Sequence, residues 1–60
     1  MPYVNVKLAG KISREQKAEI AERITELLEK TAGKPRQYTY VVFEEVPAED
    51  WAVGGRLLSE

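Results

Sequence analysis

Pro2 directly follows Met1, and this position could make it chemically reactive. Methionine aminopeptidases usually remove a Met that precedes proline, which leaves the pyrrolidine nitrogen as a free secondary amine. An unperturbed terminal amine has a pKa of about 7.7–8.0, so it can accept a proton near neutral pH. If Met1 stays in place, the same nitrogen lies in an amide and is blocked. Pro2 then simply begins an extended segment.

Other residue types that carry chemistry are scarce. The chain contains no cysteine and no histidine, and its acidic residues lack the spacing of a calcium loop, so we expect neither a metal nor another cofactor. Nine basic and ten acidic residues give a net charge of −1, which argues against a nucleic-acid-binding surface. Since no apolar run reaches transmembrane length and no signal peptide is evident, we expect a cytoplasmic protein without a membrane partner.

Two regular elements are predicted in the first half of the chain. Val4, Val6 and Leu8 alternate with polar or aromatic residues over 3–8, which is typical of a strand with one face in the core. A Ser-x-x-Gln capping box and apolar residues at three- and four-residue spacing predict a helix over 14–32. Its capping box is Ser13 and Gln16, its apolar side is Ile20, Ala21, Ile24, Leu27, Leu28 and Ala32, and it stops at Gly33 and Pro35.

A second strand is predicted at residues 38–43, a dense run of β-branched and aromatic residues that ends before Pro47. Because a helix separates the two strands, we expect them to be parallel and joined by a right-handed crossover. The neighbouring carboxylates of Glu44 and Glu45 point to opposite faces of a strand, so they do not form an acid/base pair.

The last residues predict a turn or short helical loop at 47–51, a hairpin at Val53-Gly54-Gly55 and a short final strand at Leu57-Leu58. The fold class is therefore α+β: a βαβ subunit with two parallel strands and a C-terminal hairpin, in one domain over 1–60.

The second strand is apolar on both faces, because Val41 and Phe43 fall on one face and Tyr40 and Val42 on the other. A single helix covers only one face of a two-stranded sheet. A chain of 60 residues has too little else to cover the second face, so other subunits must supply it. We therefore expect a homo-oligomer in which the subunits build larger sheets.

Several short motifs occur in the same order as in a known family. They are Pro2 with the alternating strand Tyr3 to Leu8, the run Glu15-Gln16-Lys17, the strand Val41 to Glu45, and Trp51 followed by Ala52-Val53-Gly54-Gly55. In these motifs, over essentially its whole length, the chain resembles the 4-oxalocrotonate tautomerase family. The resemblance implies a βαβ fold, a catalytic amino-terminal proline exposed by removal of Met1, and a hexamer built as a trimer of dimers.

The chain departs from the family at the carboxylate-binding positions. Well-known members hold a substrate carboxylate with one arginine before the helix and another at the start of the second strand. Here these places are taken by Ile12 and Tyr40. Lys11, one residue earlier, could serve the first role without the bidentate fork of arginine, and Tyr40 could donate a hydrogen bond without charge. Trp51 keeps the aromatic wall of the pocket.

The resemblance implies a tautomerase or isomerase that acts on a small 2-keto or 2-hydroxy-unsaturated acid, with Pro2 as general base. The substrate-binding residues are then Lys11, Tyr40 and Trp51. For each of these a structural role is the alternative: Pro2 as a strand start, Lys11 as a solvated lysine, and Tyr40 and Trp51 as contacts between subunits.

We expect the cation that polarises the substrate to come from Lys11, or from Arg36 or Arg56 of another subunit. Two further functions stay open. The chain could be a non-catalytic oligomeric or ligand-binding module that kept the fold and lost the arginines. It could also act as a dehalogenase or hydratase on an unsaturated acid, although no group that would activate water is evident.

Overall fold

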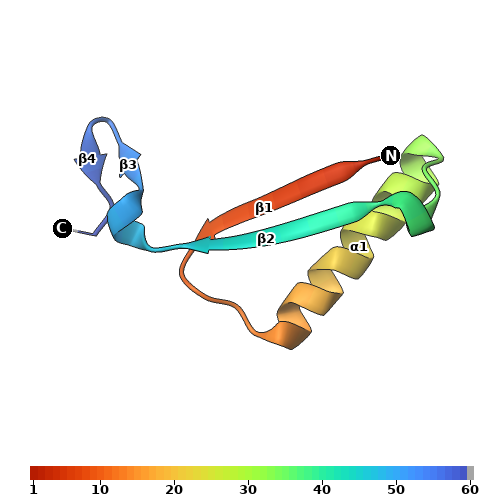
Figure 1. The fold of residues 1–60 in the computed structure, drawn as a ribbon, viewed down its shortest axis with the longest axis horizontal. Coiled ribbons are helices and arrows are strands. Elements are labelled where there is room, and N and C mark those ends of the chain that lie inside the picture. Colours follow the sequence, from red (N-terminus) through yellow and green to blue (C-terminus); the bar gives the residue numbers. More distant parts are fainter. Residues whose placement is uncertain (60) are drawn as a thin grey trace.

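The computed structural model describes residues 1–59 and contains one long helix, a two-stranded parallel sheet and a small hairpin (Figure 1). In chain order the elements are β1 (Tyr3–Ala9), α1 (Arg14–Ala32), β2 (Tyr40–Val46), β3 (Ala52–Val53) and β4 (Arg56–Leu57). The predicted βαβ subunit with parallel strands and a C-terminal hairpin is confirmed.

The helix α1 has the bounds that the sequence predicts. The Ser13 hydroxyl accepts a hydrogen bond from the Gln16 N–H at 3.1 Å, and the Gln16 side-chain oxygen accepts one from the Ser13 N–H at 2.8 Å. These reciprocal bonds satisfy two of the N–H groups that a helix start leaves unpaired. At the other end Gly33 takes a left-handed conformation with a φ of 66°, which favours glycine, and its N–H donates to the Glu29 carbonyl.

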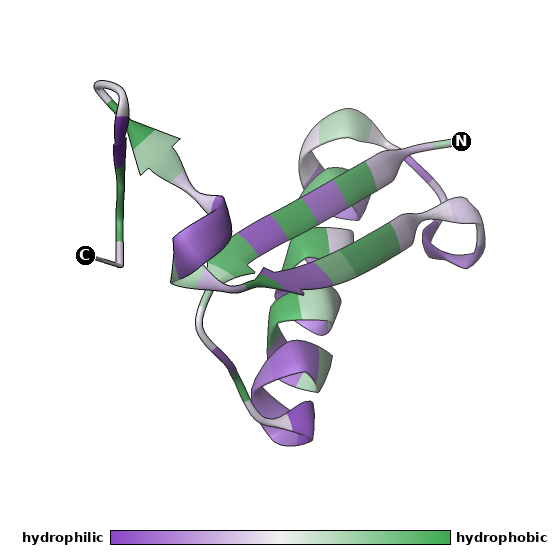
Figure 2. Ribbon diagram, turned by 60° about the vertical axis from the view of Figure 1, so that its left-hand side comes forward, coloured by the Kyte–Doolittle hydropathy of each residue, from purple (hydrophilic) through white to green (hydrophobic). Residues whose placement is uncertain are grey.

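The parallel sheet presents its apolar side chains to α1. Val4 stands opposite Val41 and Val6 opposite Phe43, and all four are half-buried while their strand neighbours are exposed. Figure 2 shows this alternation as hydrophobic and hydrophilic bands along β1. Half-buried residues of α1 include Ile20, Ala21, Ile24 and Leu28.

The prediction that Leu27 belongs to the same apolar side is wrong, because Leu27 is exposed in the single chain. It lies beside the i, i+4 row Ile20–Ile24–Leu28 rather than on it, at the edge of the stripe that the sheet covers.

The second strand begins later than the sequence predicts. Residues Arg36–Tyr38 form a short 3₁₀ turn behind Pro35, in which the Tyr38 N–H donates to the Pro35 carbonyl at 3.1 Å. A residue whose N–H closes such a turn cannot use it in the sheet, so β2 starts only at Tyr40. It then runs past the predicted end to Val46, in register with the last residue of β1. The final strand likewise lies one residue earlier than predicted.

The chain is more open than a compact protein of its size. Its radius of gyration is 14.4 Å, whereas compact chains of this length have a value of about 10 Å. Its exposed surface is 4828 Å², about 800 Å² more than the roughly 4000 Å² expected for a compact protein of 6.8 kDa. No residue among 1–59 is fully buried. The isolated chain therefore lacks a closed core, in line with the expected need for further subunits.

Candidate active site

Pro2 lies at the start of β1, at the end of the sheet remote from the hairpin (Figure 1). It is half-buried, while Met1 in front of it is 86% exposed. The Pro2 carbonyl accepts a hydrogen bond from the Tyr40 N–H at 3.0 Å. This bond ties Pro2 to the start of β2, so the sheet itself fixes where the nitrogen of Pro2 lies.

Two tyrosines accompany Pro2. Tyr3 and Tyr40 are direct partners across the two strands, so their exposed side chains leave the same face of the sheet. The Tyr3 hydroxyl accepts a hydrogen bond from the Asn5 side chain at 3.4 Å. We refer to Pro2, Tyr3 and Tyr40 as the amino end of the sheet. Its two aromatic side chains are neutral and each offers a hydroxyl group.

Glu45 organises the opposite end of the sheet. Its carboxylate accepts a hydrogen bond from the Ile12 N–H at 3.1 Å and forms an ion pair with Lys17 at 3.5 Å. The bond from the Ile12 N–H, followed by the positive charges of Lys17 and Lys11, lowers the pKa of Glu45 below its ordinary value. Lys11 thus lies in the field of a carboxylate. A hollow of about 340 Å³ opens here between Gly10, Lys11, Glu45 and Pro47.

Trp51 is held at the same end by its indole ring. The ring N–H donates to the Val46 carbonyl at 3.1 Å, and the side chain is partly buried. The Trp51 main chain is fixed as well, because its N–H donates to Ala48 and its carbonyl accepts from Leu58, at 3.1 and 3.0 Å. We refer to Lys11, Glu45 and Trp51 as the carboxyl end of the sheet.

The structure therefore separates the predicted site residues into two pairs. Pro2 and Tyr40 lie together, and Lys11 and Trp51 lie at the other end of the strands. Seven residues of parallel strand at 3.3 Å each place the two ends about 20 Å apart. A small acid cannot reach across this distance, so one chain does not bring the four residues into one site.

Arg36 is engaged elsewhere. Its guanidinium forms ion pairs with Glu22 at 3.1 Å and Glu29 at 3.3 Å, and these hydrogen bonds raise the pKa of Arg36. The expectation that Arg36 could supply the cation of a site is not supported, because two carboxylates of α1 already neutralise it. Arg56, in β4, enters no ion pair among residues 1–59.

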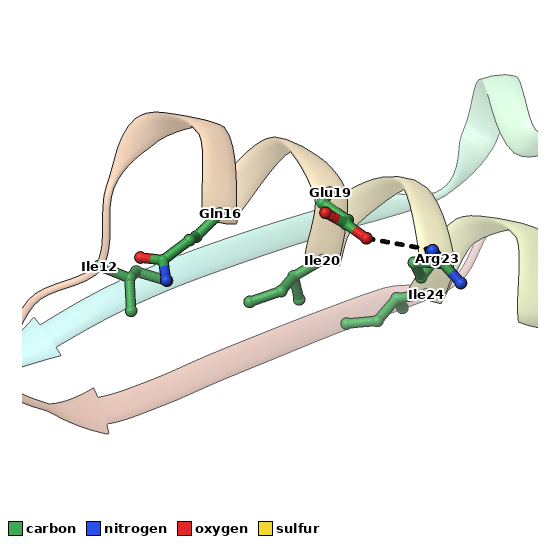
Figure 3. Close-up of a pocket in the computed structure, with 6 residues that line it drawn as sticks. All are labelled: Ile12, Gln16, Glu19, Ile20, Arg23 and Ile24. Atoms are coloured by element: carbon green, nitrogen blue, oxygen red, sulfur yellow. Dashed lines mark hydrogen bonds and ion pairs between the residues drawn. The ribbon is translucent and has the colours of Figure 1, made fainter.

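A broad groove of about 700 Å³ lies along α1 beside β1 and is open to solvent (Figure 3). Its apolar lining is Ile12, Ile20 and Ile24, and an ion pair of 3.1 Å between Glu19 and Arg23 borders it. The groove contains none of the predicted site residues, and the acid that lines it, Glu19, is paired with Arg23. We therefore assign no chemistry to it.

Glu45 is the residue of this region that the sequence analysis missed. A signal was available, because a parallel register that pairs the two strands through to their ends puts residue 45 opposite Leu8, beside the loop that carries Lys11. Within residues 1–59 no cluster of acidic side chains could hold a metal ion. None of the helices in this part of the chain has the length and hydrophobicity needed to span a membrane.

Comparison with known proteins shows one consistent similarity. A family model described as "Tautomerase enzyme" matches residues 2–60. The 2-hydroxymuconate tautomerase of Bacillus subtilis (strain 168) is 37% identical over 60 residues, which cover 100% of this chain and 97% of that protein.

Solved structures agree with this similarity. YwhB, a homologue of 4-oxalocrotonate tautomerase, superposes with a TM-score of 0.90 at 36% identity, over 98% of this chain and 97% of that one. A heterohexamer 4-oxalocrotonate tautomerase from Chloroflexus aurantiacus J-10-fl superposes with a TM-score of 0.87 at 28% identity, over 100% and 97% of the two chains.

Proposed function

The chain belongs to the tautomerase family, and on this premise we propose that Pro2 is the general base of an isomerase for small 2-keto or 2-hydroxy-unsaturated acids. The observation that carries the proposal is the place of Pro2. It begins the family match, and a hydrogen bond to Tyr40 fixes it at the start of β1. Removal of Met1 exposes its nitrogen as a secondary amine.

The reaction needs a single group that moves one proton. The amine takes the proton from the enol oxygen, a C=O bond forms as the conjugated C=C bond shifts, and the same proton returns to carbon. The ammonium thereby becomes the free amine again, so atoms and charges balance. A terminal amine with a pKa near the working pH suits both steps.

The neighbours of Pro2 in the working site come from another copy of the chain. We propose that Trp51 of this copy forms an apolar wall beside the amine, which disfavours the protonated form and holds the amine pKa close to neutral. Lys11 adds positive charge that attracts an anionic substrate, and Tyr40 donates a hydrogen bond. The heterohexameric relative supports assembly from several subunits, and we propose a homohexamer arranged as a trimer of dimers.

The test is ketonisation of 2-hydroxymuconate, followed by ultraviolet absorbance, with protein whose intact mass shows that Pro2 is the first residue. In Pro2→Ala we expect a loss of at least about 10²-fold in kcat. The matched control is Pro35→Ala, which removes a proline whose nitrogen is always in an amide and should keep full turnover. Full activity of Pro2→Ala would contradict the proposal.

A non-catalytic ligand-binding module is the second candidate, favoured by Ile12 and Tyr40 at the two positions where arginine is expected. Covalent labelling separates the candidates. A free amine of low pKa in a pocket reacts selectively with a small electrophilic acid such as bromopyruvate, and mass spectrometry locates the adduct on Pro2. A module without the base would be labelled at no single position.

A further inference from the structure

The C-terminal hairpin has two different faces. Val53 pairs directly with Arg56, and Ala52 pairs with Leu57. Because side chains alternate along a strand, Trp51 and Val53 point to the same side, and their partners across the hairpin share it. One face therefore carries Trp51, Val53, Arg56 and Leu58, and we refer to these four residues as the hairpin face. It combines an aromatic ring, two aliphatic side chains and one cation.

The hairpin face is open in the single chain. Val53 is 68% exposed and Leu58 is 50% exposed. The hairpin projects beyond the sheet (Figure 1), and Figure 2 draws β3 in hydrophobic colours while the other arm passes from purple to green. A second copy of this chain is the partner that fits the hairpin face. The whole chain, hairpin included, exposes about 800 Å² more than a compact protein of its mass, which equals one partner's share of a standard protein interface.

Arg56 is one of four cations that enter no ion pair within residues 1–59, the others being Lys11, Arg14 and Lys34. Within residues 1–59, ion pairs with carboxylates engage the cations Lys7, Lys17, Arg23, Lys30 and Arg36. Lys11 and Glu45 line the same hollow. Arg56 has an apolar partner across the hairpin and no ion pair in this part of the chain. Its planar fork can hold a carboxylate through two parallel hydrogen bonds, which a lysine cannot.

We infer that the hairpin face closes the site of a neighbouring copy, where Arg56 holds the carboxylate of a substrate that has only one. This inference rests on the proposed function of Pro2. The hairpin face offers one cation, and the amino end of the sheet offers the neutral rings of Tyr3 and Tyr40. Lys11 attracts the anion from a distance, but it lies beside the Glu45 carboxylate and so leaves no free charge for a second substrate carboxylate. The remainder of the substrate therefore meets aromatic and aliphatic side chains, against which a second carboxylate would be desolvated without a partner. The substrate class is a 2-hydroxy-unsaturated monoacid with an apolar remainder.

Two substrates that differ by one carboxylate test the inference. They are 2-hydroxypenta-2,4-dienoate, a monoacid, and 2-hydroxymuconate, the corresponding diacid. We expect the wild-type chain to show a kcat/KM at least about tenfold higher for the monoacid, since a desolvated and unpaired charge is costly. In Arg56→Gln the KM for the monoacid should rise roughly 10- to 100-fold with little change in kcat, because a hydrogen bond to a charged group is lost.

The controls separate charge from geometry. Lys34→Gln changes the net charge equally at an exposed site away from the hairpin and should leave KM unchanged. Arg56→Lys should fall between the wild type and Arg56→Gln, and Lys11→Gln should affect KM less than Arg56→Gln. An unchanged KM in Arg56→Gln, or a preference for the diacid, overturns the inference while leaving the role of Pro2 intact. Loss of turnover of both acids by the wild type would overturn the proposed function as well.

Discussion

The two ends of the parallel sheet differ in what they offer a substrate. The amino end provides the nitrogen of Pro2 and two neutral rings, held by the hydrogen bond between Tyr40 and Pro2. The carboxyl end provides charges around Glu45 and the anchored ring of Trp51. Because about 20 Å of strand separates them, each end can supply only part of the site that we propose. The comparison teaches that one chain keeps the proposed base and its proposed pocket apart, so the proposed function requires assembly to bring them together.

The same separation explains why the chain is so open. None of the residues 1–59 is fully buried, and the hairpin stands away from the sheet. A surface that closes on another copy can supply the missing core and the missing half of the site in one step. Stability and activity should therefore depend on the same contacts between copies.

Breaking the contact between the amino end of one copy and the carboxyl end of another should have the largest effect on turnover. Dilution below the assembly range should abolish turnover, because no copy then carries both halves. Each tenfold dilution should also lower the free energy of unfolding by up to about 1.4 kcal/mol per subunit. Specific activity measured over a dilution series, together with the mass from sedimentation velocity, checks this. Monomers that keep full specific activity would contradict it.

Loosening only the carboxyl end should have a smaller effect. In Ser13→Ala the helix start next to Ile12 loses the hydroxyl that accepts from the Gln16 N–H. We expect a loss of about 1 kcal/mol in the free energy of unfolding, with kcat unchanged at temperatures where the protein stays folded. Thermal unfolding measures this loss at fixed protein concentration. Ser59→Ala, at an exposed position, is the matched control and should shift the midpoint little.

Changing only the charge at the carboxyl end should have the smallest effect, and one that depends on pH. The pKa of Glu45 is lowered in the fold, chiefly by the Ile12 N–H and then by Lys17. Its contribution to stability is therefore present above its unfolded pKa and is lost as the pH falls through the folded value. The wild type should unfold at a higher temperature than Glu45→Gln at pH 7.

Lowering the pH tests the predicted direction of this stability difference. As the pH falls from the ordinary range of a glutamate carboxyl through the lowered pKa of Glu45, the difference in melting temperature between wild type and Glu45→Gln should shrink towards zero. Glu26 also has a lowered pKa, through Lys30, but it is common to both proteins and cancels in the difference. Glu49→Gln, in the exposed 3₁₀ turn before Trp51, is the matched control and should leave the melting temperature at pH 7 close to that of the wild type. A difference that grows on acidification would contradict the assignment.

Local signals made most of the fold predictable. The capping residues Ser13 and Gln16 and the terminator Gly33 set the helix bounds correctly, because caps act over a few residues. The predicted start of the second strand was wrong, because the turn at Arg36–Tyr38 depends on a hydrogen bond to Pro35 and not on β-propensity.

The site was less predictable than the fold. The sequence analysis assigns Pro2, Lys11, Tyr40 and Trp51 to one site. The length of the strands divides them between the two ends of the sheet. The ion pairs that engage Arg36 and the bond from Ile12 to Glu45 link residues far apart in the chain. Such contacts follow from the register and from the packing of α1, which no local pattern specifies.

Subunit mixing tests most directly whether the site joins the amino end of one copy to the carboxyl end of another. Pro2→Ala and Trp51→Ala chains are each purified, shown to be impaired, and refolded together in equal amounts. If Pro2 and Trp51 of one site come from different copies, random assortment restores about a quarter of the wild-type turnover. If both residues come from the same copy, the mixed assemblies stay as impaired as their parents, and the account is contradicted.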